Sequence, residues 1–409
     1  MTPFQRRLSL ALIAFVLAVS YGIWYAYSVI MVTLLAEFGW SRSLLAGAFS
    51  VFTLVHGVAN PLIGMLSDRL RPERMIAWGG VGLGLSLWLD SYIATPWHLY
   101  AGFGVLTAAA VASCGWVPAV VLVQRRFADR LGLALGIASA GVGAGILLVV
   151  PLCQYLIDAI GWRMMFRVLG LLCMACIVPA AILLERIGNV PLGPRSPQAG
   201  GAPSRTGAQA LTLREAARGI PFWLMFACFF FGNVSSQTLH VHQVAFLVDH
   251  GVAAIVAASA VGVVGLASIA GKIGGGWLSD RVERELVYIG GISIMVASVA
   301  ALLAVGSAPT RWGMYTYAIM LGIGYSVTAS LIPAMLSDRF SGPNFGAIFG
   351  MGLLASALGS AVGPWLAGSI FDLTGSYTVP FAIAAACGFI AATAGWLARV
   401  LRRRAASAH

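Results

Sequence analysis

The chain has 409 residues, of which 59% are hydrophobic and only 10% are charged, and its mean hydropathy is +0.89. Soluble globular domains carry about 25% charged residues, so this composition excludes a soluble protein and predicts a multi-pass membrane protein. The net charge of +11 would point to nucleic-acid binding in a soluble chain, but in a membrane protein it is first a signal of orientation.

Apolar stretches long enough to cross a bilayer as helices recur along the whole chain. They lack the alternation of membrane β-strands, which excludes a barrel. Of the 25 Lys and Arg residues, 20 fall on the side that holds both predicted termini, and the positive-inside rule makes that side cytoplasmic. We therefore predict an all-α protein of the cell membrane with cytoplasmic termini and twelve spans, at residues 9–35, 44–66, 75–95, 98–122, 131–157, 164–186, 219–247, 252–277, 286–306, 311–335, 344–370 and 377–400.

The longest gap between predicted spans is rich in Pro, Gly, Ser and Ala, which is typical of a linker. We predict a six-helix half at residues 1–186, a cytoplasmic linker at 187–218 and a second six-helix half at 219–409. Near the end of the linker, Thr212 and Glu215 have the spacing of a capping box, which predicts a short helix before span seven.

A loop motif repeats between the two predicted halves. Asp68-Arg69 follows span two and Asp280-Arg281 follows span eight, an offset of 280 − 68 = 212 residues, and Arg126 and Arg339 repeat with an offset of 339 − 126 = 213. Two parallel six-span halves are typical of secondary transporters that alternate around a central site. We predict that the two Asp-Arg pairs are conformational latches on the cytoplasmic side.

These residues resemble a known family. The Gly-x-Leu-Ser-Asp-Arg loops after spans two and eight are similar to the loop motif of the major facilitator superfamily. The resemblance implies the major facilitator fold, with twelve transmembrane helices in two six-helix halves. A narrower resemblance is to the monocarboxylate transporters, and the chain is also similar to the oxalate and formate exchangers. The narrower resemblance rests on Arg125-Arg126, the run at 133–141, Gly161-Trp162-Arg163, Phe166, the run at 337–340 and Gly363-Pro364.

The eighth predicted span contains Lys272, which is the only lysine in the chain. An ammonium group within an apolar helix costs about 2.5–3.5 kcal/mol on insertion scales unless it meets a partner or water, and no Asp or Glu lies in the same span. Helical spacing puts Lys272 on one face with Gly265, Ser268 and Gly276. We predict that Lys272 binds an anionic substrate; snorkelling of its side chain to the interface is the alternative.

The resemblance adds to this prediction. In the monocarboxylate transporters, an arginine at this point of the eighth helix pairs with the substrate carboxylate, which implies the same role for Lys272. The ammonium group of lysine is a compact charge, whereas the guanidinium group of arginine is planar and can donate two parallel hydrogen bonds to a carboxylate. Ser268 stands where the family has a carboxylate associated with proton coupling, and the family's first-helix lysine falls near Ser28 or Val29. Proton coupling through those two groups is therefore left open.

The seventh predicted span carries a polar stripe that includes Asn233, Gln237 and His240. Such a stripe must face protein or water rather than lipid. We predict that it binds substrate and that His240 serves a proton pathway, because histidine titrates near neutral pH. Hydrogen bonding between helices is the alternative.

Three other spans supply further candidates. His56 in span two is a second candidate for the proton pathway, and a buried neutral histidine satisfied by its neighbours is the alternative. Tyr25 and Ser28 in span one and Tyr325 in span ten are candidates for the lining of a substrate cavity, with packing as the alternative. Glycines of spans five and eleven suit close helix contact; they are Gly136, Gly141, Gly145, Gly346 and Gly350.

No catalytic set, cofactor motif or metal-ligand cluster stands out in the sequence, so an enzyme is not predicted. We predict a secondary active transporter that moves a small organic monocarboxylate through the lipid bilayer by alternating access, with protons as a candidate co-substrate and no nucleic-acid partner. The alternatives are an anion exchanger, a drug or metabolite exporter, and a transporter-like sensor. A cation exporter is disfavoured because no Asp or Glu is evident inside a span.

Overall fold

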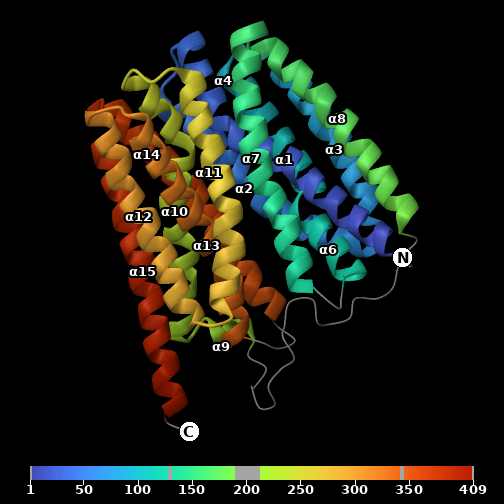
Figure 1. Cartoon of the computed structure of the whole chain (residues 1–409), viewed down its shortest axis with the longest axis vertical. Helices are drawn as coiled ribbons and strands as arrows, with labels where there is room; N and C mark the ends of the chain where they lie inside the picture. Colours follow the sequence, from blue (N-terminus) through green and yellow to red (C-terminus); the bar gives the residue numbers. More distant parts are fainter. Residues whose placement is uncertain (1, 128–130, 189–211, 341–344, 408–409) are drawn as a thin grey trace.

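The structure is a computed structural model and describes residues 2–127, 131–188, 212–340 and 345–407. Within these ranges the chain forms helices joined by short turns, without a β-strand (Figure 1). The helices are α1 (Pro3–Phe38), α2 (Arg42–Arg69), α3 (Pro72–Asp90), α4 (Pro96–Leu99), the π-helix η1 (Tyr100–Thr107), α5 (Ala108–Cys114), α6 (Trp116–Arg126), α7 (Leu131–Ile160), α8 (Trp162–Ile187), α9 (Leu213–Ala216), α10 (Ile220–Asp249), α11 (Ala254–Ser279), α12 (Arg284–Ser307), α13 (Arg311–Arg339), α14 (Phe345–Thr374) and α15 (Thr378–Ser407).

Each predicted span is covered by a helix, and span four is covered by α4, η1, α5 and α6 in succession. In the described part of the chain, nine helical segments are long and apolar enough to cross a membrane. The other three spans correspond to α3, α10 and α13. Of these, α3 has only 19 residues, and polar side chains interrupt the apolar sequence of α10. The prediction of an all-α membrane protein is confirmed.

The helices extend beyond the predicted spans because local caps satisfy their end groups. The Thr2 side chain accepts a hydrogen bond from the Gln5 backbone and starts α1 at Pro3 rather than at residue 9. Gly39, with φ of 63°, ends α1 in the left-handed region that glycine adopts readily, and Ser41 then caps α2. The predicted capping box of Thr212 and Glu215 is present at α9.

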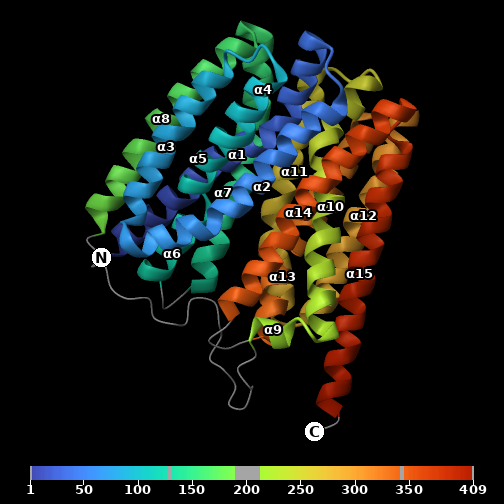
Figure 2. The ribbon, with the colours of Figure 1, turned by 180° about the vertical axis from the view of Figure 1, so that it is seen from behind.

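The helices form two groups, α1 to α8 and α10 to α15 (Figures 1 and 2). The ribbons of the two groups converge at the end of the molecule that holds α4, which we call the far end. They diverge toward the end that holds α6, α9 and both chain termini, which we call the terminal end. The contacts between groups are made mainly by α7 with α11 and by α2 with α14.

Helix packing repeats between the two groups. In the first group α1 packs along α7 and α3 along α8; in the second, α10 packs along α14 and α12 along α15. These are the first and fifth, and the third and sixth, spans of each group. The pattern is that expected for the repeated motifs 212 or 213 residues apart, and it supports the proposed division of the chain into two six-helix halves.

The repeated arginines lie at equivalent places near the terminal end. Arg126 is buried and pairs with Glu73 of α3 at 2.5 Å, and it also donates to the Leu184 carbonyl of α8 at 2.9 Å. In the second group Arg339 donates to the Ala398 carbonyl of α15 at 3.0 Å. Arg126 thus connects α6 with α3 and α8, Arg339 connects α13 with α15, and neither contact joins the two groups.

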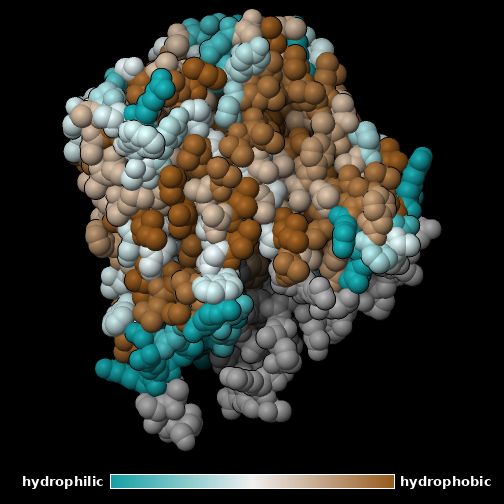
Figure 3. Space-filling model, viewed as in Figure 1, coloured by the Kyte–Doolittle hydropathy of each residue, from teal (hydrophilic) through white to brown (hydrophobic). Residues whose placement is uncertain are grey.

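The surface agrees with a bilayer environment. Apolar side chains dominate the middle of the face in Figure 3, while hydrophilic side chains gather mainly toward its upper and lower edges. Large apolar residues such as Trp78, Leu148 and Phe389 are more than half exposed. Such residues would be unfavourable in water but suit a hydrocarbon surface.

Candidate functional site

Five of the predicted site residues meet where α1, α10, α11 and α13 approach one another. We call Tyr25, Gln237, His240, Ser268 and Tyr325 the central cluster. The His240 ring lies 5.0 Å from the Tyr25 ring and 4.6 Å from the Tyr325 ring, measured between centroids. The Tyr325 hydroxyl interacts with those of Tyr25 and Ser268, and Tyr25 also interacts with Gln237. The cluster therefore joins residues from both groups of helices.

His240 presents a hydrogen-bond acceptor to this cluster. Its Nδ1 lies 2.8 Å from the Ser236 carbonyl oxygen, and because a carbonyl can only accept, Nδ1 carries the proton and Nε2 of the neutral ring keeps its lone pair. Neither His240 Nε2 nor Gln237 Oε1 has a hydrogen-bond partner among the described residues, although both atoms are buried. Buried polar atoms are normally paired, so this side of the cluster suits a donor from a substrate or from a bound water.

Lys272 of α11 lies one turn beyond Ser268. Its Nζ donates to the Ser139 carbonyl of α7 at 3.0 Å, so it reaches across to the other group of helices. No described carboxylate is within ion-pair distance of Nζ. An ammonium has three donors, and this one bond leaves two of them for an anion or water.

A second set of buried donors lies in the first group, around His56. The Asn60 amide nitrogen is 3.3 Å from His56 Nδ1, so Nδ1 accepts and Nε2 carries the proton. The Trp24 and His56 rings meet edge to face at 4.8 Å. Neither Trp24 Nε1 nor His56 Nε2 has a partner in the described ranges. The unpaired donor of Trp24 was not predicted from the sequence.

Two of the predicted substrate-binding residues have partners within the protein. Ser28 is buried and donates to the Tyr25 carbonyl of its own helix at 3.1 Å. Asn233 donates to the Phe229 carbonyl at 2.8 Å and accepts from Ser360 of α14 at 3.3 Å. These bonds favour packing as the role of Ser28 and hydrogen bonding between helices as the role of Asn233.

The predicted latches lie at the ends of α2 and α11, both at the terminal end. The side chains of Asp68 and Arg69 lie outside the described residues. Arg281 follows α11 and contacts that helix alone among the contacts described: it donates to the Trp277 carbonyl at 3.1 Å and lies 3.9 Å from the centre of the Trp277 ring. Asp280 is exposed. The latch role of these pairs stays a prediction.

The far end is closed by a network that the sequence did not reveal. The Arg42 side chain of α2 pairs with Asp249 of α10 at 2.8 Å and donates to the Tyr377 hydroxyl at 2.6 Å. Backbone N–H groups of Arg42 and Ser43 donate to the Asp372 carboxylate of α14 at 2.9 and 2.8 Å. A carboxylate at a helix N-terminus is favoured by the helix dipole. The network thus joins the two groups of helices.

This network continues inward through Tyr377 to His242. Burial raises the pKa of the Tyr377 hydroxyl, so it remains neutral and can donate to His242 Nδ1 at 3.0 Å. His242 Nε2 donates to the Pro364 carbonyl at 2.8 Å. Both nitrogens of this histidine are therefore occupied, in contrast to those of His240.

The structure also corrects the expectation that no carboxyl group lies inside a span. Asp90 at the end of α3 is 1% exposed. The sequence placed it within span three but near the adjoining turn, where a solvated side chain is usual. The helix η1 packs against α3 and covers it, and no local pattern predicts this contact.

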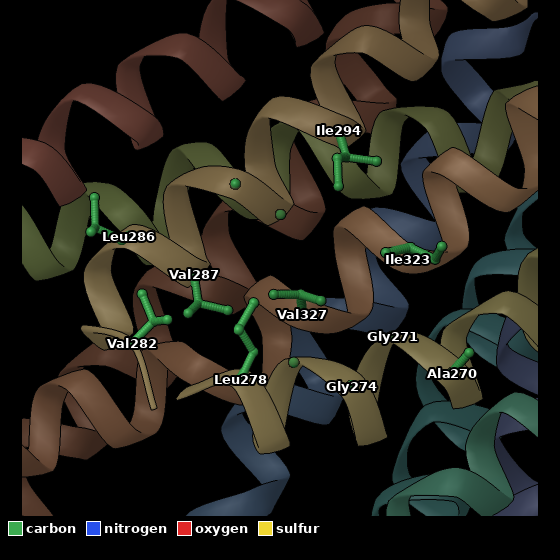
Figure 4. Close-up of a pocket in the computed structure, with 13 residues that line it drawn as sticks. Ala270, Gly271, Gly274, Leu278, Val282, Leu286, Val287, Ile294, Ile323 and Val327 are labelled. Carbon is green, nitrogen blue, oxygen red and sulfur yellow. The ribbon is translucent and has the colours of Figure 1, made fainter. Parts of the chain in front are cut away.

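A pocket in the second group of helices is not part of the central cluster. It has a volume of about 350 Å³ and lies between α11, α12 and α13. Figure 4 shows that apolar side chains such as Leu278, Val287 and Val327 line it. Its α11 residues Ala270 and Gly274 are each two positions from Lys272, on nearly the opposite side of the helix. Without a polar group this pocket is unsuited to an organic anion.

Among the described residues, no three side chains of His, Cys, Asp or Glu gather closely enough to hold a metal ion. Lys272 supplies one ammonium group, and the central cluster supplies two phenols, a serine hydroxyl, an amide and an imidazole. These groups can bind and orient a small polar anion by charge and hydrogen bonds.

The sequence of the chain is similar to those of known membrane transporters. A sequence model of the Major Facilitator Superfamily matches residues 13–308 and 243–409. The chain is 27% identical over 390 residues to Monocarboxylate transporter 13 of Bos taurus, covering 93% of this chain and 85% of the relative. It is 27% identical over 378 residues to Monocarboxylate transporter 11 of Homo sapiens, covering 88% and 76%.

The fold also resembles that of a solved structure. A bacterial homologue of the human lysosomal transporter Spinster, in an inward-facing and unoccupied conformation, matches with a TM-score of 0.71 at 18% identity. The match covers 97% of this chain and 98% of that one. This likeness concerns the fold alone.

Proposed function

This chain belongs to the Major Facilitator Superfamily, and on that premise we propose that it is a secondary active transporter of a small organic monocarboxylate. The superfamily consists of membrane transporters and not of enzymes. The relatives named as monocarboxylate transporters support the substrate class. In this proposal the anion binds between the two halves and crosses the cell membrane by alternating access, with both termini in the cytoplasm.

The observation that carries the proposal is the environment of Lys272. It is the only lysine of the chain, it lies inside a spanning helix, and its one described bond is to a carbonyl of the opposite half. A cation in this place is stable when an anion joins it. Snorkelling does not account for this contact, because the ammonium reaches toward α7 and not toward an interface.

The central cluster supplies the rest of the binding site. Tyr25 and Tyr325 contribute hydroxyl groups, and Ser268 links Tyr325 to the helix of Lys272. Gln237 and His240 offer acceptors to a hydroxyl group or a water held with the substrate. Because the helices that carry these residues come from both halves, closure of one end and opening of the other changes the side from which the site is reached.

Anion exchange is the second candidate, and the residue at position 268 favours it. Ser268 stands where the resembled family has a carboxylate, and a serine hydroxyl cannot take up and release a proton as a carboxylate does. Its hydroxyl instead donates to the Gly265 carbonyl at 2.7 Å. Counterflow that does not respond to a pH gradient would support exchange over symport.

The test is uptake of labelled carboxylates into proteoliposomes by Lys272→Ala and Lys272→Arg. Loss of the counter-charge of a buried anion costs at least about 2 kcal/mol, so we expect the alanine variant to bind substrate about 30-fold more weakly or worse. The arginine variant should keep part of the activity because the charge remains. Normal uptake by Lys272→Ala would refute the proposed role.

Arg163→Ala is the matched control. Arg163 is a cation paired with Glu37 at 3.0 Å, and both side chains are about half exposed at the far end. Removing it should leave substrate affinity unchanged, because exposed pairs contribute little. A thermal-shift screen of mono- and dicarboxylates on purified protein, repeated with Lys272→Ala, then identifies the ligand. A sensor would bind in this screen but not accumulate substrate in vesicles.

A further inference from the structure

Asp90 is a buried carboxyl group that the proposed transport mechanism does not use. It ends α3, and only 1% of its surface is exposed. Its Oδ2 lies 3.0 Å from Thr107 Oγ1, and Thr107 Oγ1 lies 3.0 Å from Ser86 Oγ. The Ser86 hydroxyl is in turn 2.9 Å from the Leu83 carbonyl oxygen. These four groups form a chain of three contacts within the first half.

Counting hydrogens along this chain distinguishes the two states of the carboxyl group. Three contacts need three hydrogens, whereas the hydroxyls of Ser86 and Thr107 supply only two. A carboxylate can only accept, so one contact would be left without a hydrogen. A neutral carboxylic acid provides the third: Asp90 donates to Thr107, Thr107 to Ser86, and Ser86 to Leu83.

The surroundings of Asp90 offer no charge to compensate an ionised form. Its Oδ1 has no described partner, and a Cβ at Gly102 would lie 2.1 Å from it, so the η1 backbone closes over this oxygen. The titratable groups on the helices packed around it are engaged elsewhere. Tyr27 donates to the Leu45 carbonyl, Tyr100 to the Leu44 carbonyl and Arg167 to Ser91 Oγ, while His98 accepts from the Ala94 backbone.

Two other buried acids show the contrast. Glu73 and Glu285 are also less than a tenth exposed, but each pairs with an arginine, Arg126 and Arg402 respectively. Burial of a carboxylate is tolerated where such a partner exists and is costly where it does not. Of these three buried acids, Asp90 alone forms no ion pair with an arginine among the described residues.

We propose that Asp90 is a proton-binding site, that its carboxyl group is protonated in the conformation described here, and that it exchanges this proton during the transport cycle. The contact partner Thr107 lies on η1, and π-helical segments often mark functional positions in helices. A shift of η1 relative to α3 would break the bond to Thr107 and admit water to the carboxyl group. The proton then leaves to water, and the carboxylate takes one up again before the contacts re-form.

The consequence of this inference for transport rests on the proposed function. A monocarboxylate anion carried with one proton crosses without net charge, so Asp90 would make the transporter a symporter despite Ser268. The protonation of Asp90 itself does not depend on the identity of the substrate. The two parts can therefore be tested separately.

The first experiment reads the protonation of Asp90 in the full-length purified protein without substrate. Infrared spectra of wild type and Asp90→Asn are compared at neutral pH, and the carbonyl band of a protonated carboxyl group should be present in wild type and lost in the variant. Asp158→Asn is the matched control, because Asp158 is exposed on α7 and accepts from Gln154 at 2.8 Å. No band lost with Asp90→Asn would overturn the proposal.

The second experiment reads coupling in proteoliposomes. With one proton per anion, a pH gradient of one unit should drive about tenfold accumulation of substrate in wild type and in Asp158→Asn. In Asp90→Asn we expect no gradient-driven accumulation, while counterflow without a gradient continues. Tenfold accumulation by Asp90→Asn would refute the coupling role. If no protein transports a carboxylate, the proposed function fails, and the infrared result still decides whether Asp90 binds a proton.

Discussion

The two histidines of α10 and His250, which follows this helix, differ in the partners of their ring nitrogens. His242 uses both nitrogens, with Tyr377 and the Pro364 carbonyl as partners. His240 and His250 each bond through Nδ1 to the carbonyl four residues earlier, at 2.8 and 2.7 Å. Only His240 combines this bond with a buried Nε2 that has no described partner. Of the three, it is therefore the one suited to contact a transported molecule.

We predict that His240→Phe raises the KM for substrate about 10-fold or more. The phenyl ring keeps the packing against Tyr25 and Tyr325 but removes the Nε2 acceptor, and a lost hydrogen bond that leaves its partner unpaired costs about 1–3 kcal/mol. Initial rates of counterflow measure the effect. His250→Phe is the matched control, because it removes the same Nδ1 bond at the far end, and its KM should equal that of wild type. An unchanged KM for His240→Phe would exclude His240 from the site.

For individual residues, the sequence predicted which of them share a helical face but not which residues of other helices they contact. Spacing along one helix placed Gln237 and His240 together, and a single charge within an apolar span singled out Lys272. The partners Tyr325 and Ser139 come from other helices, whose relative rotation and depth no local pattern determines. Asp90 was missed for the same reason, since its burial depends on how η1 packs against the end of α3.

Close contact between α1 and α7 depends on two glycines. A Cβ at Gly141 would lie 2.1 Å from the Ala14 carbonyl oxygen, and a Cβ at Gly145 would lie 2.0 Å from that of Ala18. The prediction that these glycines allow close helix contact is confirmed. It is wrong for Gly136 and Gly350, which have no such neighbour within 4 Å, and Gly346 lies outside the described side chains. A glycine-rich sequence predicts that contact occurs but not which glycines make it.

We predict that Gly145→Ala destabilises the protein by about 1–3 kcal/mol, because the methyl group would force the α1 backbone away from α7. Gly136→Ala should instead be neutral or stabilising by up to about 1 kcal/mol, since alanine favours helix and the site has open space. Melting temperatures of the two variants in detergent provide the measurement. A Gly145→Ala protein as stable as Gly136→Ala would show that the two helices can separate without loss.

The last helix is anchored to α12 by charges at the terminal end. Glu283, in the turn before α12, accepts hydrogen bonds from Arg403 and Arg399 of α15, and these bonds lower its pKa to about 2. The usual value is about 4.3. Because the folded-state pKa is the lower one, this stabilisation is present above about pH 4.3 and is lost only as pH falls toward 2. Glu283 therefore cannot cause a change in transport between pH 5 and 8.

For the whole molecule, the sequence predicted an all-α membrane protein whose helices repeat in two groups, while the orientation stays a prediction. Hydrophobic length and arginine distribution carry that information, because the bilayer imposes it on each span separately. The relation between the halves could not be predicted in this way. The closure at the far end uses α2, α10, α14 and the turn before α15, and its residues Arg42, Asp249, Asp372 and Tyr377 belong to no motif.

This closure gives a prediction about the conformational equilibrium. The far-end network joins the two halves, whereas at the terminal end the described ion pairs, such as Arg284 with Asp338 at 2.6 Å, stay within one half. The network therefore favours the conformation that is closed at the far end. Removing it should shift the population toward the opposite conformation, since an equilibrium responds to any interaction made in only one of its states.

We expect Arg42→Ala to raise the population open at the far end by about 10- to 100-fold, because charged hydrogen bonds contribute about 1.5–3 kcal/mol. Spin labels at Trp97 and Trp312, which are 80% and 83% exposed, report the separation of the halves by electron paramagnetic resonance. In Arg42→Ala, the longer distance between the two labels should become more populated. Arg163→Ala also removes an ion pair at the far end, but one within the first half, so its distance distribution should match that of wild type. Equal distributions for all three proteins would mean that the Arg42 network does not hold the halves together.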